Sequence, residues 1–117
     1  MKILITGASG FIGSYLFKKF SETNHDVYGL VRKKPSLDLL KKNKDKIIIS
    51  DLVNYESLNK LIPKKVDLII HAGAYNDQDT NNNVESAYLT NIYGTRNICK
   101  IANSRNVKKL IYFSVLQ

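Results

Sequence analysis

The residues best suited to chemistry in this sequence form a glycine-rich turn close to the N-terminus. Glycines at positions 7, 10 and 13 follow a short apolar run and lead into an amphipathic segment. Between a strand and a helix, this arrangement is typical of a dinucleotide site, where free backbone N–H groups, expected here at residues 10–12, bind the pyrophosphate. The expected contacts are Gly7, Ser9, Gly10, Phe11, Ile12 and Gly13. The alternative is an ordinary strand–turn–helix without a ligand.

A basic pair follows the turn after roughly twenty residues, at the end of the next apolar run. Arg32 and Lys33 stand where dinucleotide-binding folds place an acidic residue for NAD or an arginine for NADP. The planar guanidinium of Arg32 suits the 2′-phosphate of NADP, and Lys33 adds charge. We therefore expect NADP as the preferred cofactor. NAD as the cofactor and a solvated basic loop are the alternatives.

Short apolar runs that alternate with helical patterns indicate the elements that position these residues. Such an alternation predicts parallel βαβ units. The runs are nearly continuous in hydrophobicity, as expected for strands that helices cover on both faces. The predicted strands are residues 2–6, 26–31, 46–50, 66–71 and 109–114.

Four helical segments connect the predicted strands. The first has an apolar face with a spacing of four residues, formed by Ile12, Leu16 and Phe20. A short second helix is expected within residues 34–45. The third is stopped by Pro63, and its apolar residues are Tyr55, Leu58, Leu61 and Ile62. The longest covers residues 82–103, with an apolar stripe of Val84, Ala87, Tyr88, Ile92, Thr95, Ile98, Cys99 and Ala102.

Together these elements predict an α/β fold, a Rossmann-like doubly wound parallel sheet. Right-handed crossovers between adjacent parallel strands favour the strand order 3-2-1-4-5. The order reverses between the first and fourth strands. A ligand is therefore expected in the crevice at that point, outside the carboxyl ends of the strands.

Composition narrows the classes of function. A length of 117 residues leaves room for one domain. The apolar runs are far too short to cross a bilayer, and the single cysteine, Cys99, excludes an internal disulfide and fits the cytoplasm. The net charge of +8 comes from lysines at element ends and in loops, without interleaved aromatic residues. Neither a membrane nor a nucleic acid is therefore expected as a partner, and no metal site is predicted.

Several motifs, in the expected order, resemble the extended short-chain dehydrogenase/reductase family, in its NAD-dependent epimerase/dehydratase group. The glycine turn has this family's three-residue spacing. The segment Ser50-Asp51-Leu52 is similar to the family's acidic element after strand three, which implies an adenine contact at Asp51 beside Leu52. The segment His71-Ala72-Gly73-Ala74 resembles the family's H-x-A-A, whose backbone lies along the diphosphate and ribose. Gly73 stands where alanine is more usual.

The long helix carries a further motif of the same family. Its sequence from Asn91 to Ile98 resembles N-x-x-G-T-x-N-(L/I). The resemblance implies that Asn91 points towards the sheet and the nicotinamide half of the site, whereas Gly94 and Thr95 are packing positions. A structural hydrogen bond from Asn91 to a neighbouring strand or loop is an equal alternative.

The resemblance implies the NAD(P)-binding portion of a sugar-nucleotide epimerase, dehydratase or reductase that works by hydride transfer. The family's catalytic tyrosine, with a lysine four residues later, lies well beyond strand five and past residue 117. Tyr15 and Lys19 have this spacing but fall on the first helix, so no catalytic residue is assigned. Val115 stands where the family places a substrate-binding hydroxyl, although a one-residue slip would place Ser114 there.

We therefore expect residues 1–117 to form an incomplete NAD(P)-binding Rossmann domain, truncated after strand five and without the substrate lobe. Such a chain would bind cofactor without turnover, and a nucleotide-sugar only together with the missing lobe. Strand five would have an uncovered flank. A homodimer is open, because the family often dimerises through helices. The alternative function is a non-catalytic NADP-binding sensor or scaffold, with which Val115 and Arg32 are compatible.

Overall fold

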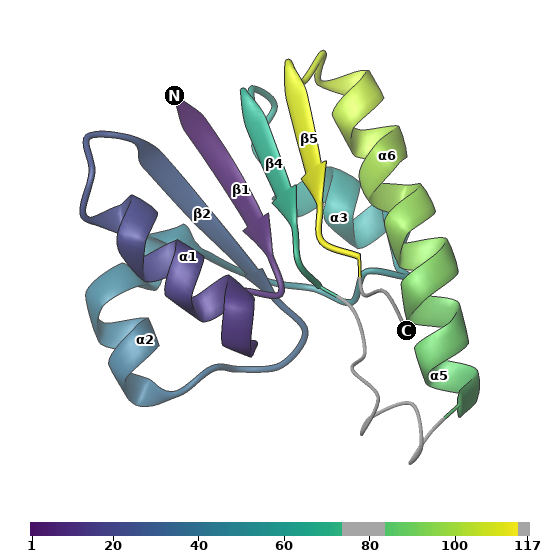
Figure 1. The fold of residues 1–117 in the computed structure, drawn as a ribbon, viewed down its shortest axis with the longest axis horizontal. Coiled ribbons are helices and arrows are strands. Elements are labelled where there is room, and N and C mark those ends of the chain that lie inside the picture. The colour runs from purple at the N-terminus through teal and green to yellow at the C-terminus, as the bar shows by residue number, and fades with distance from the viewer. Residues whose placement is uncertain (74–83, 115–117) are drawn as a thin grey trace.

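Five parallel strands form the centre of the molecule. The structure, a computed structural model, describes residues 1–73 and 84–114 (Figure 1). The strands are β1 (Lys2–Thr6), β2 (Asp26–Val31), β3 (Ile47–Ile49), β4 (Leu68–His71) and β5 (Lys109–Tyr112). Their order is β3-β2-β1-β4-β5 with every pair parallel, which confirms the predicted doubly wound sheet. Each strand lies within its predicted range, and the last three are shorter than predicted.

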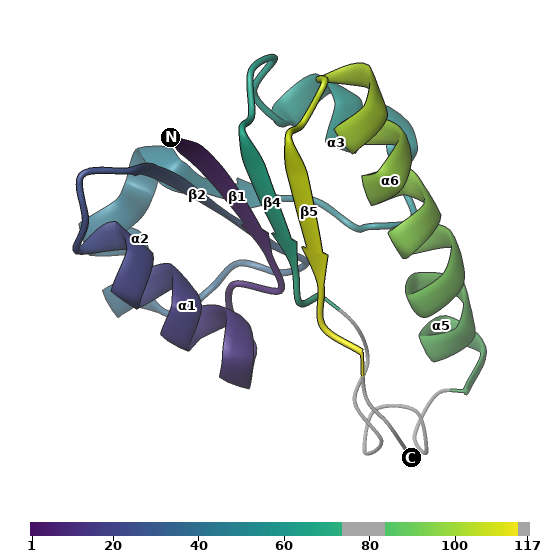
Figure 2. The same cartoon turned by 45° about the horizontal axis from the view of Figure 1, so that its top comes forward.

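Helices cover both faces of the sheet. After β1 and β2 come α1 (Phe11–Ser21) and α2 (Leu37–Asn43), the latter followed by a 3₁₀ turn, η1 (Lys44–Lys46). After β3 comes α3 (Tyr55–Leu61), and a longer helix precedes β5. The longer helix consists of α5 (Val84–Leu89), the π-helical turn η2 (Thr90–Gly94) and α6 (Thr95–Ser104). Figures 1 and 2 place α1 and α2 on one face, with α3, α5 and α6 on the other.

Two apolar layers hold the helices to the sheet. Because successive strand side chains point to opposite faces, Leu4 packs with α3 and α6, whereas Ile3 and Ile5 pack with α1. The first layer contains Leu4, Leu30, Ile48, Leu52, Leu58, Ile62, Val66, Ile69, Ile98 and Ile101. The second contains Ile3, Ile5, Ala8, Phe17, Val27, Val31, Leu68 and Ile70. Burial on both faces explains why the strand sequences are nearly continuous apolar runs.

The first helix is rotated relative to its predicted orientation. Its buried residues are Gly13 and Phe17. Of the predicted apolar face, Ile12 is 46% exposed, and the other two members are partly buried. The prediction is therefore wrong at Ile12. The cause is the contact between the helix and the glycine turn, since a Cβ at Gly13 would lie 1.9 Å from the carbonyl oxygen of Gly7. That approach turns Gly13, and Phe17 one helical turn later, towards the sheet.

The long helix also buries a face different from the one predicted. Its inward residues are Ala87, Thr90, Gly94, Asn97, Ile98 and Ile101. Four members of the predicted stripe are exposed, namely Val84, Tyr88, Ile92 and Cys99. The predicted stripe is wrong at these positions because Thr90, Gly94 and Asn97 are polar or small, so a search for apolar periodicity passes over them.

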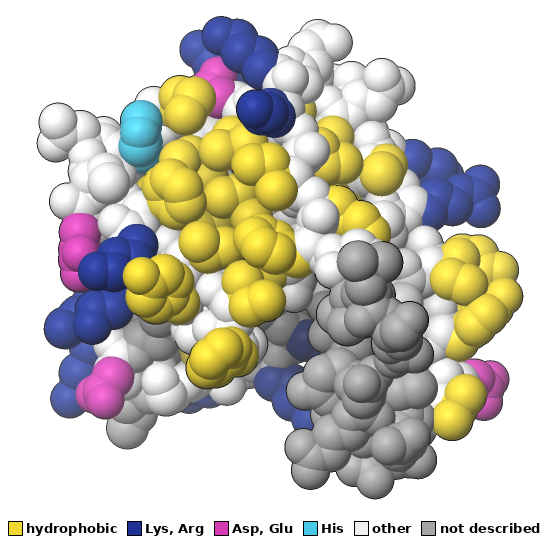
Figure 3. Space-filling view, viewed as in Figure 1, with side chains coloured by type: hydrophobic (Ala, Val, Ile, Leu, Met, Phe, Trp, Pro, Cys, Tyr) yellow, Lys and Arg dark blue, Asp and Glu magenta, His cyan; other side chains and the backbone are white. Residues whose placement is uncertain are grey.

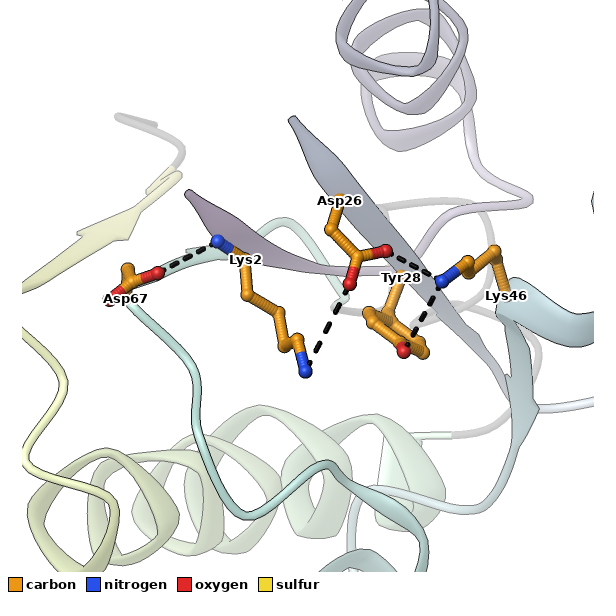
Figure 4. A network of polar contacts seen from close by, with 5 residues as sticks. All are labelled: Lys2, Asp26, Tyr28, Lys46 and Asp67. Carbon is orange, nitrogen blue, oxygen red and sulfur yellow. Dashed lines mark hydrogen bonds and ion pairs between the residues drawn. The ribbon is translucent and has the colours of Figure 1, made fainter. Parts of the chain in front are cut away.

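A network of polar contacts lies at the amino-terminal ends of the strands (Figure 4). The Asp26 carboxylate lies 2.6 Å from Lys46 Nζ and 3.9 Å from Lys2 Nζ. The hydrogen bond to Asp26 raises the pKa of Lys46. The backbone N–H of Lys2 donates to the Asp67 carboxylate over 2.8 Å, which lowers the pKa of Asp67. These contacts join β1, β2 and the segments that lead into β3 and β4, at the end of the sheet opposite to the expected crevice.

Arg105, immediately after α6, ties the long helix to the C-terminus of α3. Its guanidinium donates to the backbone and side-chain oxygens of Asn59, over 2.8 and 2.7 Å. It also donates to the carbonyl oxygens of Ile62 (3.2 Å) and Pro63 (3.3 Å). Helix C-termini leave carbonyl groups without intrahelical partners, so Arg105 supplies donors where α3 needs them.

Strand β5 lies at the edge of the sheet, and all four of its residues are exposed. Figure 3 shows hydrophobic side chains gathered beside α1 and the strands next to it. Exposed apolar residues of the described chain include Ile12 on α1 and Ile111 on β5.

No helix within residues 1–73 and 84–114 is both long and apolar enough to cross a membrane.

Candidate functional site

A cleft of about 160 Å³ lies at the carboxyl ends of the strands, where the strand order reverses between β1 and β4. This is the position that the topology predicts for a ligand. Sites for whole small-molecule ligands usually enclose about 300–1,000 Å³, so the cleft between the described residues accommodates part of a dinucleotide. It is lined by Gly7, Ser9, Gly10, Leu30, Arg32, Ser50, Asp51, Leu52, Ala72, Gly73 and Thr90.

The glycine turn forms one wall of the cleft. Gly7 leaves β1 with φ of +67°, a left-handed conformation that favours glycine. A Cβ at this position would also lie 2.7 Å from the carbonyl oxygen of Ala72 and from Cα of Gly73. The turn that follows β1 and the turn that follows β4 are therefore in direct contact, and only a glycine at position 7 permits it.

The N-terminus of α1 opens on the same wall, with a difference from the expected pattern of donors. The N–H of Gly10 donates to the Gly7 carbonyl over 2.9 Å, so the prediction of a free N–H at Gly10 is wrong. Gly10 caps α1 without a side-chain hydrogen bond, and its own carbonyl accepts the first helical bond, from Ser14. The N–H groups of the first helical turn remain as donors for a ligand, at the positive end of the helix dipole.

Three expected contacts on α1 do not line the cleft. The side chain of Phe11 is 95% exposed and that of Ile12 is 46% exposed. Gly13 is buried against the turn. A contact from Phe11 or Ile12 to a ligand would therefore have to come from the backbone, whereas the position of Gly13 fits its expected role in close packing.

The turn after β3 forms the opposite wall. The N–H of Val53 donates to one carboxylate oxygen of Asp51 over 3.1 Å, which fixes the orientation of an otherwise exposed side chain. Ser50, buried beside it, donates to the hydroxyl of Ser57 over 2.8 Å. The side-chain amide of Asn97 on α6 donates to the carbonyl of Leu52 over 2.8 Å. The segment with the expected adenine contact is thus held by side chains from α3 and α6.

The two basic residues after β2 differ in position. Both side chains are exposed, but Arg32 lines the cleft, as Asp51 does, whereas Lys33 lies outside the lining. The cleft therefore presents one cationic and one anionic side chain at the ends of the neighbouring strands β2 and β3. Arg32 is suited to bind a phosphate group, and Asp51 is suited to accept a hydrogen bond from a ligand.

The segment after β4 divides between the cleft and the interior. Ala72 and Gly73 line the cleft, but the His71 ring is buried and does not. His71 Nδ1 lies 2.6 Å from Thr6 Oγ1, and Nε2 lies 3.0 Å from Thr95 Oγ1. Burial lowers the pKa of His71 to about 4. Ala74, the fourth residue of this predicted motif, lies outside the described residues.

The long helix contributes Thr90 instead of the expected Asn91. Thr90 opens the π-helical turn and lines the cleft with 9% of its surface exposed. Asn91, the next residue, is half-buried and outside the lining. The prediction that Thr95 is a packing position agrees with its contact to His71. At the other packing position, a Cβ on Gly94 would lie 2.8 Å from Cβ of Leu52.

Sequence reasoning missed three lining residues, Leu30, Ser50 and Thr90. Leu30 and Ser50 flank predicted contacts at strand ends, so their proximity to the site could have been read from their position alone. Thr90 gave no such signal, because its inward direction depends on how the π-helical turn sets the helix face.

The cleft is suited to binding a ligand, but the residues that line it do not form a catalytic group. Tyr15 on α1 is 62% exposed, and its ring centroid lies 5.7 Å from Lys19 Nζ, away from the cleft lining. The pair therefore lies on α1, as the sequence predicts. Within the described residues, no group of three or more side chains suited to metal coordination occurs. Val115 lies outside the described residues.

Comparison with known proteins identifies relatives along almost the whole chain. Residues 3–115 match the family described as the NAD dependent epimerase/dehydratase family. Protein CapI of Staphylococcus aureus is 33% identical, over 97% of this chain and 37% of its own length. The dTDP-D-glucose 4,6-dehydratase of Dictyostelium discoideum is 34% identical, over 97% of this chain and 28% of its own length.

Solved structures show the same fold. The UDP-Glc/GlcNAc 4-epimerase of Campylobacter jejuni superposes with a TM-score of 0.80 and 29% identity, over 95% of this chain and 36% of that chain. The UDP-glucose 4-epimerase of Bifidobacterium longum, in complex with NAD⁺ and UDP, has a TM-score of 0.79. It is 21% identical over 97% of this chain and 37% of that chain, which is a likeness of fold alone. The chain spans about a third of the length of these proteins.

Proposed function

Because the chain belongs to the NAD-dependent epimerase/dehydratase family, we propose that its cleft binds a nicotinamide dinucleotide. Three turns that are distant in sequence, after β1, β3 and β4, line one cleft at the reversal of strand order, and this convergence supports the proposal. Each turn carries a residue that the family resemblance assigns to the cofactor. The convergence of Gly10, Asp51 and Gly73 is what a bound dinucleotide requires.

Each part of the cleft suits one part of the cofactor. The N-terminus of α1, beyond Gly10, offers N–H groups and a positive dipole end for the diphosphate. The Asp51 carboxylate, oriented by the hydrogen bond from the Val53 N–H, would accept a hydrogen bond from the adenine amino group. The backbone of Ala72 and Gly73 would lie along the ribose and diphosphate. When bound, the nicotinamide ring would supply hydride exchange with a substrate carbon.

Within this site we propose a preference for NADP. Arg32 lines the cleft at the end of β2, and no acidic residue occurs between Gly29 and Lys34. A guanidinium binds phosphate through paired hydrogen bonds, whereas the ribose hydroxyls of NAD need an acceptor there. Lys33, although outside the lining, adds positive charge beside Arg32. NAD remains the second cofactor to test.

The broader activity is proposed for a protein that holds more than residues 1–117. The names of the relatives point to nucleotide-linked sugars as substrates and to epimerase or dehydratase chemistry. We assign this chain the incomplete NAD(P)-binding domain and no catalytic residue, so it binds cofactor without turnover. A tyrosine followed four residues later by a lysine, encoded beyond residue 117, would complete the enzyme.

The remaining parts of the proposal concern location and partners. The free cysteine Cys99 fits a cytoplasmic protein. Lysines that lie at element ends and in loops, without interleaved aromatic residues, argue against nucleic acid as a partner. Val84, Tyr88 and Ile92 are exposed along α5 and η2, and an apolar helix face of this kind supports a homodimer.

The location of the site is tested by NMR on ¹⁵N-labelled chain with unlabelled NADP⁺. The proposal expects the largest shift changes at the amides of Gly7, Gly10, Asp51 and Gly73. Shifts confined to the lysine-rich segment around residues 41–46 would indicate non-specific anion binding and would refute the proposed site.

A further inference from the structure

A chain of hydrogen bonds runs from the long helix through the sheet to the wall of the cleft. Thr95 on α6 lies 3.0 Å from His71 Nε2, and His71 Nδ1 lies 2.6 Å from the hydroxyl of Thr6 on β1. The same Thr6 oxygen accepts the N–H of Gly73 over 2.9 Å. Thr6 is 0% exposed and His71 is 1% exposed, so solvent does not compete for these bonds.

The directions of these bonds assign one tautomer to His71. The Thr6 oxygen accepts from Gly73, and within the described residues the Thr6 side chain has no partner besides Gly73 and His71. The Thr6 hydroxyl hydrogen must therefore point at Nδ1, which acts as the acceptor. The proton of the neutral ring is then on Nε2 and is donated to Thr95. The reverse tautomer would leave the Thr6 hydroxyl hydrogen buried without an acceptor, which is costly.

Gly73 is the last residue in this series of hydrogen bonds, and a small shift of its backbone would move other residues of the cleft. It lines the cleft and contacts the turn after β1, since a Cβ at Gly7 would lie 2.7 Å from Cα of Gly73. A Cβ added to Gly73 would lie 3.0 Å from both Leu52 Cδ1 and Thr6 Oγ1, and 3.1 Å from the backbone nitrogen of Gly7. The backbone of Gly73 thus sits between the two walls, with little room to move without shifting one of them.

The same turn of α6 also holds the opposite wall. Asn97, two residues after Thr95, donates to the carbonyl of Leu52 over 2.8 Å. One helical turn therefore contacts the segment after β3 directly and the segment after β4 through His71. Stacking of Tyr112 on the His71 ring, with centroids 5.4 Å apart, restricts the ring further.

We propose that His71 is a positioning residue of the dinucleotide cleft. As its Nε2–H tautomer it orients the Thr6 hydroxyl, and that hydroxyl fixes the Gly73 amide and with it the spacing of the cleft walls. This inference rests on the proposed function, because the spacing matters only if a dinucleotide occupies the cleft. It assigns to the side chain of His71 a task separate from the backbone contact that the family resemblance implies.

The test uses the 117-residue chain with two substitutions at one position. Thr6→Val keeps the shape of the side chain but removes the hydroxyl, whereas Thr6→Ser keeps the hydroxyl. We expect Thr6→Val to weaken dinucleotide binding about tenfold, equivalent to about 1.4 kcal/mol, and to speed hydrogen exchange at Gly73. The dissociation constant of the Thr6→Ser chain for the dinucleotide should stay within about twofold of that of the unsubstituted chain, which is a difference of less than about 0.5 kcal/mol. The matched control is Thr23→Val, whose hydroxyl bonds a backbone carbonyl at the end of α1, far from the cleft.

A spectroscopic readout makes the test independent of the folding of any variant. In the unsubstituted chain, ¹⁵N spectra of the His71 ring should show a protonated Nε2 and an unprotonated Nδ1. Protonation at Nδ1 would overturn the proposal, as would equal binding and equal Gly73 exchange in Thr6→Val. Failure of the unsubstituted chain to bind any dinucleotide would instead refute the proposed function, so the two failures are distinguishable.

Discussion

Arg32 and Asp51 line the same cleft from the ends of neighbouring strands, and their charges divide the tasks of recognition between them. A charge-assisted hydrogen bond is worth more than a neutral one, and a phosphate accepts two from one guanidinium. Asp51 offers only acceptors, so it suits the adenine end shared by NAD and NADP. We therefore place discrimination between the two cofactors on Arg32.

Replacement of Arg32 tests that assignment. Arg32→Ala should weaken NADPH binding about 10- to 100-fold, the equivalent of a lost charged hydrogen bond, and should change NADH binding far less. Isothermal titration of both cofactors against both chains measures the ratio. Arg96→Ala, which removes an exposed arginine on α6, is the control. Equal losses for NADPH and NADH would contradict a 2′-phosphate contact.

The glycines of the turn have unequal mechanical roles. A Cβ at Gly13 would lie 1.9 Å from the Gly7 carbonyl oxygen, whereas a Cβ at Gly10 would lie 3.3 Å from the same atom. Gly13→Ala should therefore destabilise the fold by about 3 kcal/mol, at the upper end of overpacking costs. Gly10→Ala should cost about 1 kcal/mol or less, since only the helix cap changes. Urea unfolding of the two variants measures the difference, and similar losses would contradict this packing of α1.

At the residue scale, the sequence indicated the cleft better than it indicated individual contacts. Gly7, Asp51 and Gly73 line it as expected, Gly7 from the spacing of the glycine turn, and Asp51 and Gly73 from the resemblance to family motifs. The inward direction of Thr90 and the burial of the His71 side chain were not predictable. Both depend on tertiary contacts, which no local pattern encodes.

At the scale of elements, the strands were predictable because burial on both faces makes their sequences continuous apolar runs. The inner face of the long helix was not. Thr90 and Asn97 face inward to line the cleft and to bond Leu52, so the helix breaks the apolar pattern where it serves the site. Tyr88 and Ile92, which match that pattern, are exposed instead.

One side chain, that of Arg105, adds hydrogen bonds to the apolar packing between α3 and α6. Arg105 donates to oxygens of Asn59, Ile62 and Pro63. Arg105→Lys keeps the charge but loses the planar array of donors, so it should destabilise the chain by about 1–3 kcal/mol, the cost of unpaired acceptors. Urea unfolding measures the change, with Arg96→Lys as the control. A loss as small as that of the control would show that water replaces the guanidinium.

At the scale of the whole molecule, stability should fall in mildly acidic solution. His71 is held neutral in the fold, with its pKa lowered from 6.5 to about 4 by burial. The unfolded chain takes up a proton below pH 6.5, which the folded chain resists, so unfolding becomes easier as pH falls from 6.5 towards 4. The contribution of neutral His71 to the free energy of unfolding is fully present above pH 6.5. About 3 kcal/mol of that free energy is lost between pH 6.5 and 4.

Unfolding free energies at pH 7, 5.5 and 4 measure this dependence. His25→Asn, which removes the other histidine from a partly exposed position, should keep the decline. His71→Asn should flatten it between pH 6.5 and 4. A decline that persists unchanged in His71→Asn would show that other groups cause it.

Every role proposed for the cleft depends on the binding of a nicotinamide dinucleotide at the reversal of strand order. The most direct measurement is isothermal titration of the purified 117-residue chain with NADPH and, separately, with NADH. We predict saturable binding at one site per chain, tighter for NADPH. If the chain remains folded, as judged by circular dichroism, and binds neither cofactor, the cleft is not a dinucleotide site.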